Sequence, residues 1–501
     1  MNFLIFCVDA QIYYKSNCNR TRRKQQNTAK QQNTARIKKI YSGQVSKFTV
    51  MNVRELYEQK LKSVDEVVKL VKPGMWIGLG NLSCVGWLFD KALAERVSDL
   101  EDIKIWVEIP LKPLRCLEKD KEGRVFTVYS GFLNEFLRGK PNVFYWPGQL
   151  GQYPHLFREG YLKLDVVVKT VTPMDKNGFF NFTTDITYSR AMYESAKIKV
   201  VEVNESAPWV PGGYDECIHI SEVDYIIENR EEKLFELPPK TPTDVEIKIA
   251  ENILNILPRP LEGFTLQIGI GGVPDAFCRL LEESGAKDWG VHSEMLSEGI
   301  FRLAEAGVVT GRKKTFLPGK IVHTFALGSR RMYDWLDHNP AVAGYPSDFV
   351  NDILIISLNN NIVSINSALE VDLTGQVNAE SIGPAEYSGV GGQFAWTYAP
   401  SYRSPKAAPP IGGFSNISVI ALPSTYFDKK ANRLVSRIVP TLRPGSAVTT
   451  QRTNTMYVVT EYGVAKLKGK SVRERARELI KIAHPDFVDQ LTKEAEKLGF
   501  I

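Results

Sequence analysis

The sequence predicts an α/β fold built from two tandem, related, open α/β/α domains. From Met51 onward, short apolar runs bounded by Gly, Pro or charge alternate with longer segments of helical periodicity. A proline-rich segment divides this part of the chain near its middle. Similar landmarks also recur in both halves, which is the pattern that a duplicated domain leaves.

The apolar runs predict strands because short runs of this kind are typical of strands buried in a parallel sheet. Helical periodicity predicts helices over Val245–Leu257 and Val472–Ala483. The predicted strands are Met75–Leu79, Asp165–Val171, Ile198–Val203, Thr265–Ile270 and Ile353–Leu358.

The segment Glu236–Thr243, with the sequence ELPPKTPT, predicts an extended linker because prolines favour an extended backbone. It separates an N-terminal domain over residues 51–237 from a C-terminal domain over 244–501. Both halves open with a strand that enters a glycine loop, WIGLG around Gly78 and LQIGIGG around Gly269, 191 residues apart. Both also contain a D-x-x-G-x-x-N turn, starting at Asp175 and at Asp372, 197 residues apart.

Residues 1–50 differ from the rest of the chain. They repeat the sequence QQNTA at 25–29 and 31–35, and they hold ten Lys and Arg residues against one acid, Asp9. Burial cannot offset the cost of ordering such a polar segment, so we expect a dispensable, disordered basic tail or sequence upstream of a true start at Met51. A mitochondrial transit peptide is a third interpretation. The apolar first eight residues lack a basic flank and make a poor signal peptide.

The net charge of +6 arises in this segment, since the remainder of the chain holds 53 basic and 56 acidic residues. We therefore expect no nucleic-acid partner. No run of about 18 apolar residues predicts a membrane span. The cysteines form no CxxC motif and no zinc-like spacing, which favours reduced thiols in a cytoplasmic protein and no metal site. They are Cys7, Cys18, Cys84, Cys116, Cys217 and Cys278.

Two segments carry candidate binding chemistry. In QIGIGGVPDAF the strand–glycine–helix junction from Gly271 to Asp275 exposes backbone N–H groups that can bind phosphate, although such junctions are often only tight turns. In YSGVGGQF, three glycines after Ser388 let the backbone approach a ligand closely, or simply supply positive φ angles.

Two further segments carry candidate catalytic groups. VHSEMLSEG places Glu294 and Glu298 four residues apart, although on spacing alone this is an ordinary helix start. In GQVNAESIG, the amide of Asn378 is suited to stabilising an oxyanion, or to closing an Asx turn.

The order of these segments resembles that of the acetyl-CoA hydrolase/transferase family, which includes 4-hydroxybutyrate and butyrate–acetate CoA-transferases. The resemblance covers about nine-tenths of the chain from Met51. It rests on TPMDKNGFFNF, IGIGGVPDAF, HSEMLSEG, FALGSRRMYDWLD, NSALEVDLTGQVNAESIG, YSGVGGQF and VVTEYGVAKLKGKSVRERARELIKIAHPDF.

The resemblance implies a role for each site residue. Glu294 would be the covalent nucleophile in the C-terminal domain, and Asn378 with the backbone amide of Gly392 would form the oxyanion hole. The implied cofactor requirement is none, since a CoA thioester is the substrate. CoA would be bound by Gly271, Gly272, Val273, Pro274, Asp275, Ser388, Gly389 and Gly391.

The implied reaction transfers CoA between an acyl-CoA and a small carboxylic acid, such as acetate, butyrate or 4-hydroxybutyrate, by ping-pong kinetics through a glutamyl-CoA thioester. A hydrolase using the same residues remains the nearest alternative. A non-catalytic acyl-CoA-binding protein and a sugar-phosphate isomerase on a related fold explain Glu294 or the paired glycine loops less well. Relatives often carry an Asp- and Arg-containing run where this chain has Phe394–Pro410, so the acyl group is left open. We expect a homo-oligomer in the cytoplasm, or in the mitochondrial matrix of a eukaryote.

Overall fold

The computed structural model describes residues 52–239, 241–401 and 416–501. The tail predicted over residues 1–50, and part of the divergent segment 394–410, lie outside the described residues. Leu56–Ile501 form one compact unit, to which everything below refers. None of the described helices is both long and apolar enough to cross a membrane.

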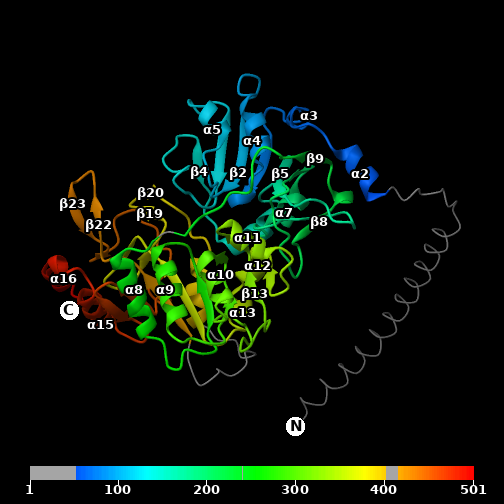
Figure 1. Cartoon of the computed structure of the whole chain (residues 1–501). Helices are drawn as coiled ribbons and strands as arrows, with labels where there is room; N and C mark the ends of the chain where they lie inside the picture. Colours follow the sequence, from blue (N-terminus) through cyan, green and yellow to red (C-terminus); the bar gives the residue numbers. More distant parts are fainter. Residues whose placement is uncertain (1–51, 240, 402–415) are drawn as a thin grey trace, which may run out of the picture. The chain divides into compact units, whose positions relative to one another are not determined.

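In the first described range, seven parallel strands form one sheet in the order β4-β3-β2-β1-β5-β7-β9 (Figure 1). Helices α3 (Val64–Val68), α4 (Trp87–Ala94) and α5 (Arg115–Lys119) share a hydrophobic core with one face of this sheet. The strands are β1 (Trp76–Asn81), β2 (Ile103–Glu108), β3 (Phe126–Ser130), β4 (Val143–Tyr145), β5 (Val166–Val171), β7 (Ile198–Val203) and β9 (Tyr225–Glu228).

Alternation along β2 shows how the two faces are filled. Ile105 and its neighbours two residues away join the core under α3–α5. Trp106 points to the opposite face, where its ring packs at 5.3 Å from Tyr153 on α6 (Tyr153–Arg158). Tyr188, just before α7 (Ser189–Ser195), accepts a hydrogen bond of 3.1 Å from the Trp106 indole. Helices therefore cover both faces of this sheet.

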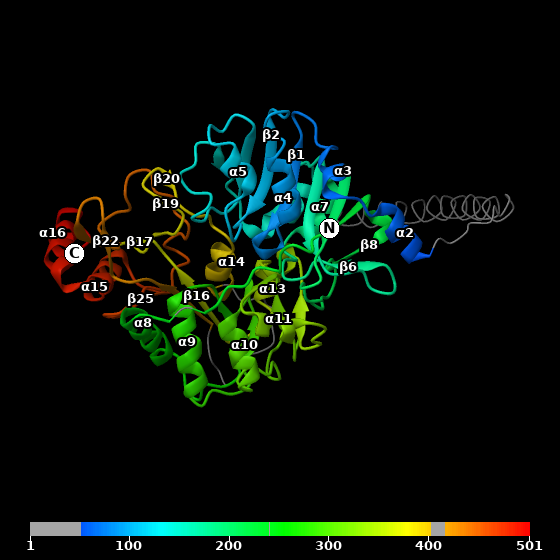
Figure 2. The ribbon, with the colours of Figure 1, turned by 45° about the horizontal axis from the view of Figure 1, so that its top comes forward.

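In the later described ranges, eight strands form a second sheet in the order β15-β13-β11-β10-β16-β21-β25-β26, with only β26 antiparallel to its neighbour. Helices α8 (Asp244–Asn255), α9 (Gly272–Glu283) and α10 (Glu298–Glu305) lie side by side in both views of the ribbon (Figures 1 and 2). The strands are β10 (Thr265–Ile268), β11 (Gly290–His292), β13 (Ile321–His323), β15 (Val342–Gly344), β16 (Ile362–Ser367), β21 (Ile417–Ala421), β25 (Tyr457–Thr460) and β26 (Gly463–Lys466).

The other face of the second sheet is covered by α12 (Ser347–Val350), α13 (Ile353–Ile356) and α14 (Gln393–Tyr398), with Trp396 of α14 in their shared core. Helices α15 (Val472–Lys481) and α16 (Pro485–Lys497) pack together at the C-terminal end of the chain (Figure 2). The remaining elements are α2 (Val53–Lys60), α11 (Arg330–Leu336), β6 (Phe179–Asn181), β8 (Cys217–His219), β12 (Met295–Ser297), β14 (Phe325–Leu327), β17 (Glu370–Asp372), β18 (Val377–Asn378), β19 (Ser381–Ile382), β20 (Ala385–Glu386), β22 (Thr425–Asp428), β23 (Arg433–Ser436) and β24 (Ile438–Val439).

The two D-x-x-G-x-x-N turns have the same geometry. The Asp175 carboxylate accepts the N–H four residues on at 2.8 Å, and the Asp372 carboxylate does the same at 3.0 Å. Val166 on β5 and Val363 on β16 each lie nine residues before these aspartates. The shared strand order and the shared turn confirm the predicted fold class, two tandem related α/β/α domains.

One predicted element was wrong. The run Ile353–Leu358, predicted as a strand, is the short helix α13. Its N-cap is Asp352, whose side chain accepts the N–H groups of Leu354 and Ile355 at 2.7 and 2.9 Å. A short apolar run is ambiguous between helix and strand, and here the capping aspartate decides for the helix. The strand expected in this region is β16, a few residues later.

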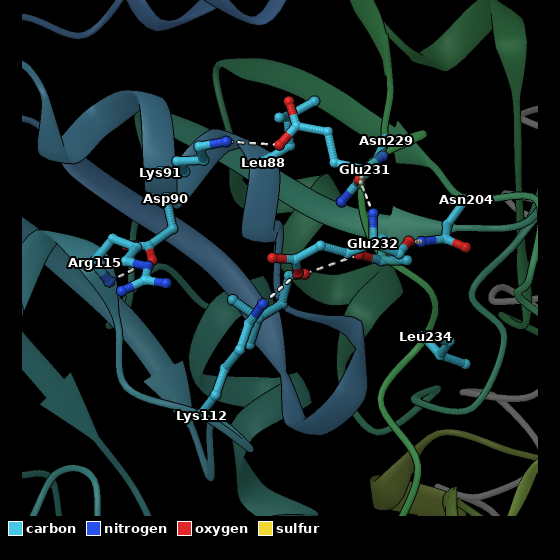
Figure 3. Close-up of polar contacts among 12 residues, drawn as sticks. Leu88, Asp90, Lys91, Lys112, Arg115, Asn204, Asn229, Glu231, Glu232 and Leu234 are labelled. Carbon is cyan, nitrogen blue, oxygen red and sulfur yellow. Dashed lines mark hydrogen bonds and ion pairs between the residues drawn. The ribbon is translucent and has the colours of Figure 1, made fainter.

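The segment that leaves the first sheet after β9 is tied down by charged and polar side chains (Figure 3). Lys91 of α4 pairs with Glu231 at 2.6 Å, and Lys112 pairs with Glu232. Asn204 donates its amide to the backbone carbonyl of Glu232 at 2.8 Å. The chain therefore begins its passage toward the second sheet along a fixed path.

Candidate active site

Glu294 lies two residues after the end of β11, at the carboxyl edge of the second sheet, and it is half-buried. Its backbone carbonyl accepts the N–H groups of Thr324 and Phe325 at 3.0 and 3.2 Å, which fixes the backbone. Its carboxylate accepts a hydrogen bond of 2.8 Å from the side-chain amide of Asn351. Glu298, four residues later, is used differently, since its carboxylate accepts hydrogen bonds from Ser329 at 2.9 and 3.0 Å.

The surroundings of Glu294 tune its acidity. Burial raises the pKa of Glu294 to about 7, and the hydrogen bond from Asn351 opposes that rise. The group is therefore a carboxylate above neutral pH, but a weakly solvated and more basic one than a surface glutamate. A perturbed carboxylate held by a directed amide is typical of a catalytic group.

The second glycine loop lies directly on this carboxylate. A Cβ atom at Gly392 would stand 2.6 Å from Asn351 Nδ2 and closer still to Glu294 Oε2. Gly391 has a φ of 52°, and a Cβ there would lie 3.7 Å from Glu294 Oε1. Only glycine allows the backbone to approach the Glu294 carboxylate so closely.

The first half of the chain clamps this loop from outside. Leu133 donates its N–H to the carbonyl of Ser388 at 3.1 Å, and Leu150 donates to that of Gly391 at 2.9 Å. A Cβ at Gly389 would run into the carbonyl of Gly131. Ser388 and Gly389 are thus held between the halves, so the site depends on both.

The first glycine loop of the second half starts beside Glu294. Ser293 Oγ exchanges hydrogen bonds of 3.2 and 3.3 Å with the backbone of Ile268, so the end of β10 lies next to the residue before Glu294. Beyond it the loop is open: no atom lies within 4 Å of the Cβ position of Gly269, and only Pro274 Cδ, at 3.9 Å, lies near that of Gly271. Helix α9 begins at Gly272, so its positive end borders this open loop.

The equivalent junction in the first half is filled. The buried carboxylate of Glu202 accepts the N–H groups of Leu88 and Phe89 at 3.2 and 3.1 Å, at the start of α4, and an amide N–H of Asn229 at 2.7 Å. Leu88 and Asn229 are labelled in Figure 3. Burial raises the pKa of Glu202 to about 7, while these hydrogen bonds lower it. At the second junction the Glu246 carboxylate of α8 lies against Gly272, where a Cβ would run into Oε1, so that junction is open only on the side of Gly269 and Gly271.

Asn378 has its side chain fully committed. Its amide donates to Glu370 Oε1 at 3.0 Å and to the carbonyl of Ser381 at 2.7 Å, and its oxygen accepts the N–H groups of Glu380 and Ser381 at 3.1 Å. This is the Asx-turn alternative that the sequence left open. The oxyanion role of Asn378 stays a prediction, and it would require one of these bonds to break.

Asn351 was missed in the sequence. It ends α12, and the next residue begins the capping of α13, so an Asn–Asp pair predicts only helix ends there. Its contact with Glu294 spans 57 residues and depends on how the two helices lie against the second sheet. Glu108, at the end of β2, was also missed, because its surroundings too depend on how segments distant in the sequence pack together.

Two family models match the chain, the acetyl-CoA hydrolase/transferase N-terminal domain over residues 45–235 and the C-terminal domain over residues 328–495. The chain belongs to the acetyl-CoA hydrolase/transferase family. As a member of this family it is an enzyme of the CoA-transferase class. In the described ranges no group of three or more His, Cys, Asp or Glu side chains is arranged to hold a metal ion.

Several family members are similar over nearly their whole length. The chain is 44% identical to the 4-hydroxybutyrate coenzyme A transferase of Clostridium kluyveri, covering 89% of this chain and 100% of that one. It is 41% identical to the probable butyrate:acetyl-CoA coenzyme A-transferase of Syntrophomonas wolfei, covering 89% and 97%. The crystal structure of RipA from Yersinia pestis superposes with a TM-score of 0.78 at 34% identity, covering 90% and 100%.

Proposed function

We propose that this protein transfers CoA from an acyl-CoA to a small carboxylic acid, with Glu294 as the covalent nucleophile. The observation that carries the proposal is the Glu294 carboxylate, held by the Asn351 amide beneath the backbone of Gly392. The open glycine loop at Gly271 provides a place for a CoA phosphate beside it.

The chemistry accounts for these residue types. The Glu294 carboxylate attacks the acyl-CoA carbonyl and expels CoA thiolate, which leaves an acyl–glutamyl anhydride. The thiolate then attacks the glutamyl carbonyl, which gives glutamyl-CoA thioester and releases the acyl group as its carboxylate. A second carboxylate runs both steps in reverse and leaves as the new acyl-CoA. Splitting one transfer into these steps conserves the energy of the thioester.

Each addition step forms an oxyanion, and donors must be in place before the charge appears. The amide of Asn351 lies at the carboxylate, and the N–H of Gly392 is donated to no other group in the described part of the chain. We assign these two groups to the oxyanions formed at Glu294. Losing one such donor typically costs ~10²–10³ in rate.

Transfer should dominate over hydrolysis, although the same residues could serve both. The thiolate is held beside the anhydride by CoA binding, and oriented groups reach effective molarities of ~10⁵–10⁸ M. Bulk water, at roughly 55 M, cannot match this unless the site admits it freely. The glycine loop clamped by Leu133 and Leu150 covers the nucleophile and limits that access.

The acyl groups belong to the class of small carboxylates, because the similar enzymes are named for butyrate, acetyl-CoA and 4-hydroxybutyrate. The direct test is a panel of acetyl-CoA, butyryl-CoA and 4-hydroxybutyryl-CoA, each assayed with and without a second carboxylate. We expect parallel lines in double-reciprocal plots. CoA release that is equally fast without an acceptor would favour the hydrolase.

The nucleophile is tested by trapping. Borohydride added after acyl-CoA alone should reduce the glutamyl thioester and inactivate the enzyme, and a second carboxylate should protect it. Glu294→Ala should lose transfer and trapping while keeping its thermal midpoint. Glu298→Ala is the matched control, because the Glu298 carboxylate accepts a hydrogen bond from the N–H of Ser329 instead. Near wild-type turnover in Glu294→Ala would overturn the assignment.

A further inference from the structure

The duplicated sheets can be aligned residue by residue, because Val166 and Val363 occupy the same place relative to the two Asp turns. In each sheet the next two strands are the glycine-loop strand and the strand beyond it, β1 then β2 in the first and β10 then β11 in the second. The residues paired across these three neighbouring strands form one row in each sheet. The two matching rows are Val166–Ile77–Ile105 and Val363–Leu266–Val291.

This alignment gives the nucleophile a counterpart. Glu294 lies three residues after Val291, and the residue three after Ile105 is Glu108. Glu108 ends β2 at the carboxyl edge of the first sheet, as Glu294 follows β11 at the edge of the second. The duplication has therefore placed a glutamate at the same position in both halves.

Glu108 is buried, with 5% of its surface exposed. A Cβ at Gly131 would meet the Glu108 carboxyl and the Tyr153 hydroxyl. The carbonyl of that same Gly131 lies against Gly389 in the loop that covers Glu294. One layer of glycine backbone from each half therefore separates the neighbourhoods of the two carboxyl groups.

The charges around Glu108 favour its neutral form. The pKa of Glu108 is raised to about 8: burial is the main cause, the charges of Asp185 and Glu294 contribute to the rise, and hydrogen bonds from Tyr188 and Gly131 oppose it. The cation of this region, Lys169, is bound to Asp185. In the described residues no Lys, Arg or His forms an ion pair with Glu108. Tyr153 and Tyr188 are the other titratable groups that face it.

We propose that Glu108 is the first half's contribution to the active site: a neutral carboxyl group that lets a carboxylate substrate approach Glu294, and whose ionisation closes the site to that substrate. The acceptor carboxylate approaches the glutamyl-CoA thioester, in which Glu294 carries no charge, so an ionised Glu108 would be the negative charge that repels it in a poorly screened site. The inference rests on the proposed function and adds to it a residue that controls the affinity for the carboxylate substrate and the upper pH limit of activity.

The kinetic test uses butyryl-CoA as donor and acetate as acceptor, from pH 6 to pH 10. In the wild type, kcat/KM for acetate should fall about tenfold per pH unit above the pKa of Glu108, mainly through KM. Glu108→Gln should remove this alkaline fall and keep neutral-pH activity within a few fold. Glu202→Gln is the matched control, because it replaces another buried glutamate of raised pKa at the start of α4, and it should keep the wild-type profile.

A second measurement works without turnover. Infrared difference spectra during a pH titration should show one protonated carboxyl band lost in the alkaline range, absent from Glu108→Gln. In Glu294→Gln this band should titrate at lower pH, because the neighbouring charge is gone. A wild type that transfers no CoA refutes the proposed function, while the infrared titration still decides whether the two carboxyl groups interact. An unchanged alkaline limb in a stably folded Glu108→Gln, or a band unmoved in Glu294→Gln, would overturn the inference.

Discussion

Replacing Gly392 by alanine should disable the enzyme by adding one methyl group. The backbone tolerates alanine there, since φ is −101°. The new Cβ would nevertheless stand 2.6 Å from Asn351 Nδ2 and closer still to Glu294 Oε2, whereas real Cβ atoms essentially never approach within 3.0 Å. The carboxylate and the loop must therefore separate by about 1 Å, and a displacement of about 1 Å can cost ~10²-fold in rate.

A loss of ~10²-fold in kcat corresponds to about 2.7 kcal/mol of transition-state stabilisation. The assay is steady-state CoA transfer in Gly392→Ala beside a thermal melt of the same sample. Stability should hold, because Gly→Ala at a compatible backbone angle often stabilises by ~0.4–1 kcal/mol. Full activity with an unchanged melt would mean that the loop does not lie on the nucleophile during turnover.

Three further variants test other parts of the structure. Asn351→Ala should lower kcat by ~10²–10³ and shift the acid limb of the pH–rate profile to higher pH, because the lost hydrogen bond is what lowers the pKa of Glu294. Lys169→Met should cost ~3–5 kcal/mol in urea unfolding by stranding the buried Asp185, and a melt like the wild type would contradict this. Glu202→Gln should gain thermal stability relative to the wild type as pH rises from 5 to 8. The pKa of Glu202 is raised to about 7 in the folded protein, so the wild type loses stability as pH rises through that value. The variant has no carboxyl group to ionise and therefore avoids this loss. A difference in thermal midpoint between variant and wild type that stays constant from pH 5 to pH 8 would refute the raised pKa of Glu202.

The fold could be predicted from local pattern because most elements are coded locally. Buried parallel strands such as β5 and β7 are continuous apolar runs, and α8 and α15 carry capping boxes at Thr243 and Ser471. The exception, α13, shows the limit. Four apolar residues carry no periodicity, and the capping role of Asp352 becomes visible only when its backbone partners are placed.

Candidate site residues could be named only where a motif kept its parts close in sequence. Gly271 to Asp275 and the loop around Gly392 were named in this way, and their roles stay predictions. The Asn351–Glu294 contact does not, because it joins a helix end to a strand end through the packing of the whole second sheet. Asn378 was named from its turn and from the family resemblance, and its role stays a prediction; Asn351 was not named, because it sits at an ordinary helix end.

The carboxylate of Glu202 has a consequence for stoichiometry. A duplicated nucleotide-binding fold would ordinarily offer two equivalent anion sites per chain, yet the start of α4 already holds an internal anion, and the aligned position on β21 is Ala421. In the second half a carboxylate from a different element takes part: Glu246 of α8 lies against Gly272 at the start of α9, and only the side of that loop at Gly269 and Gly271 is open. Calorimetric titration with CoA should therefore saturate at one molecule per chain, and Glu202→Ala is the change that would make a second, weaker site available.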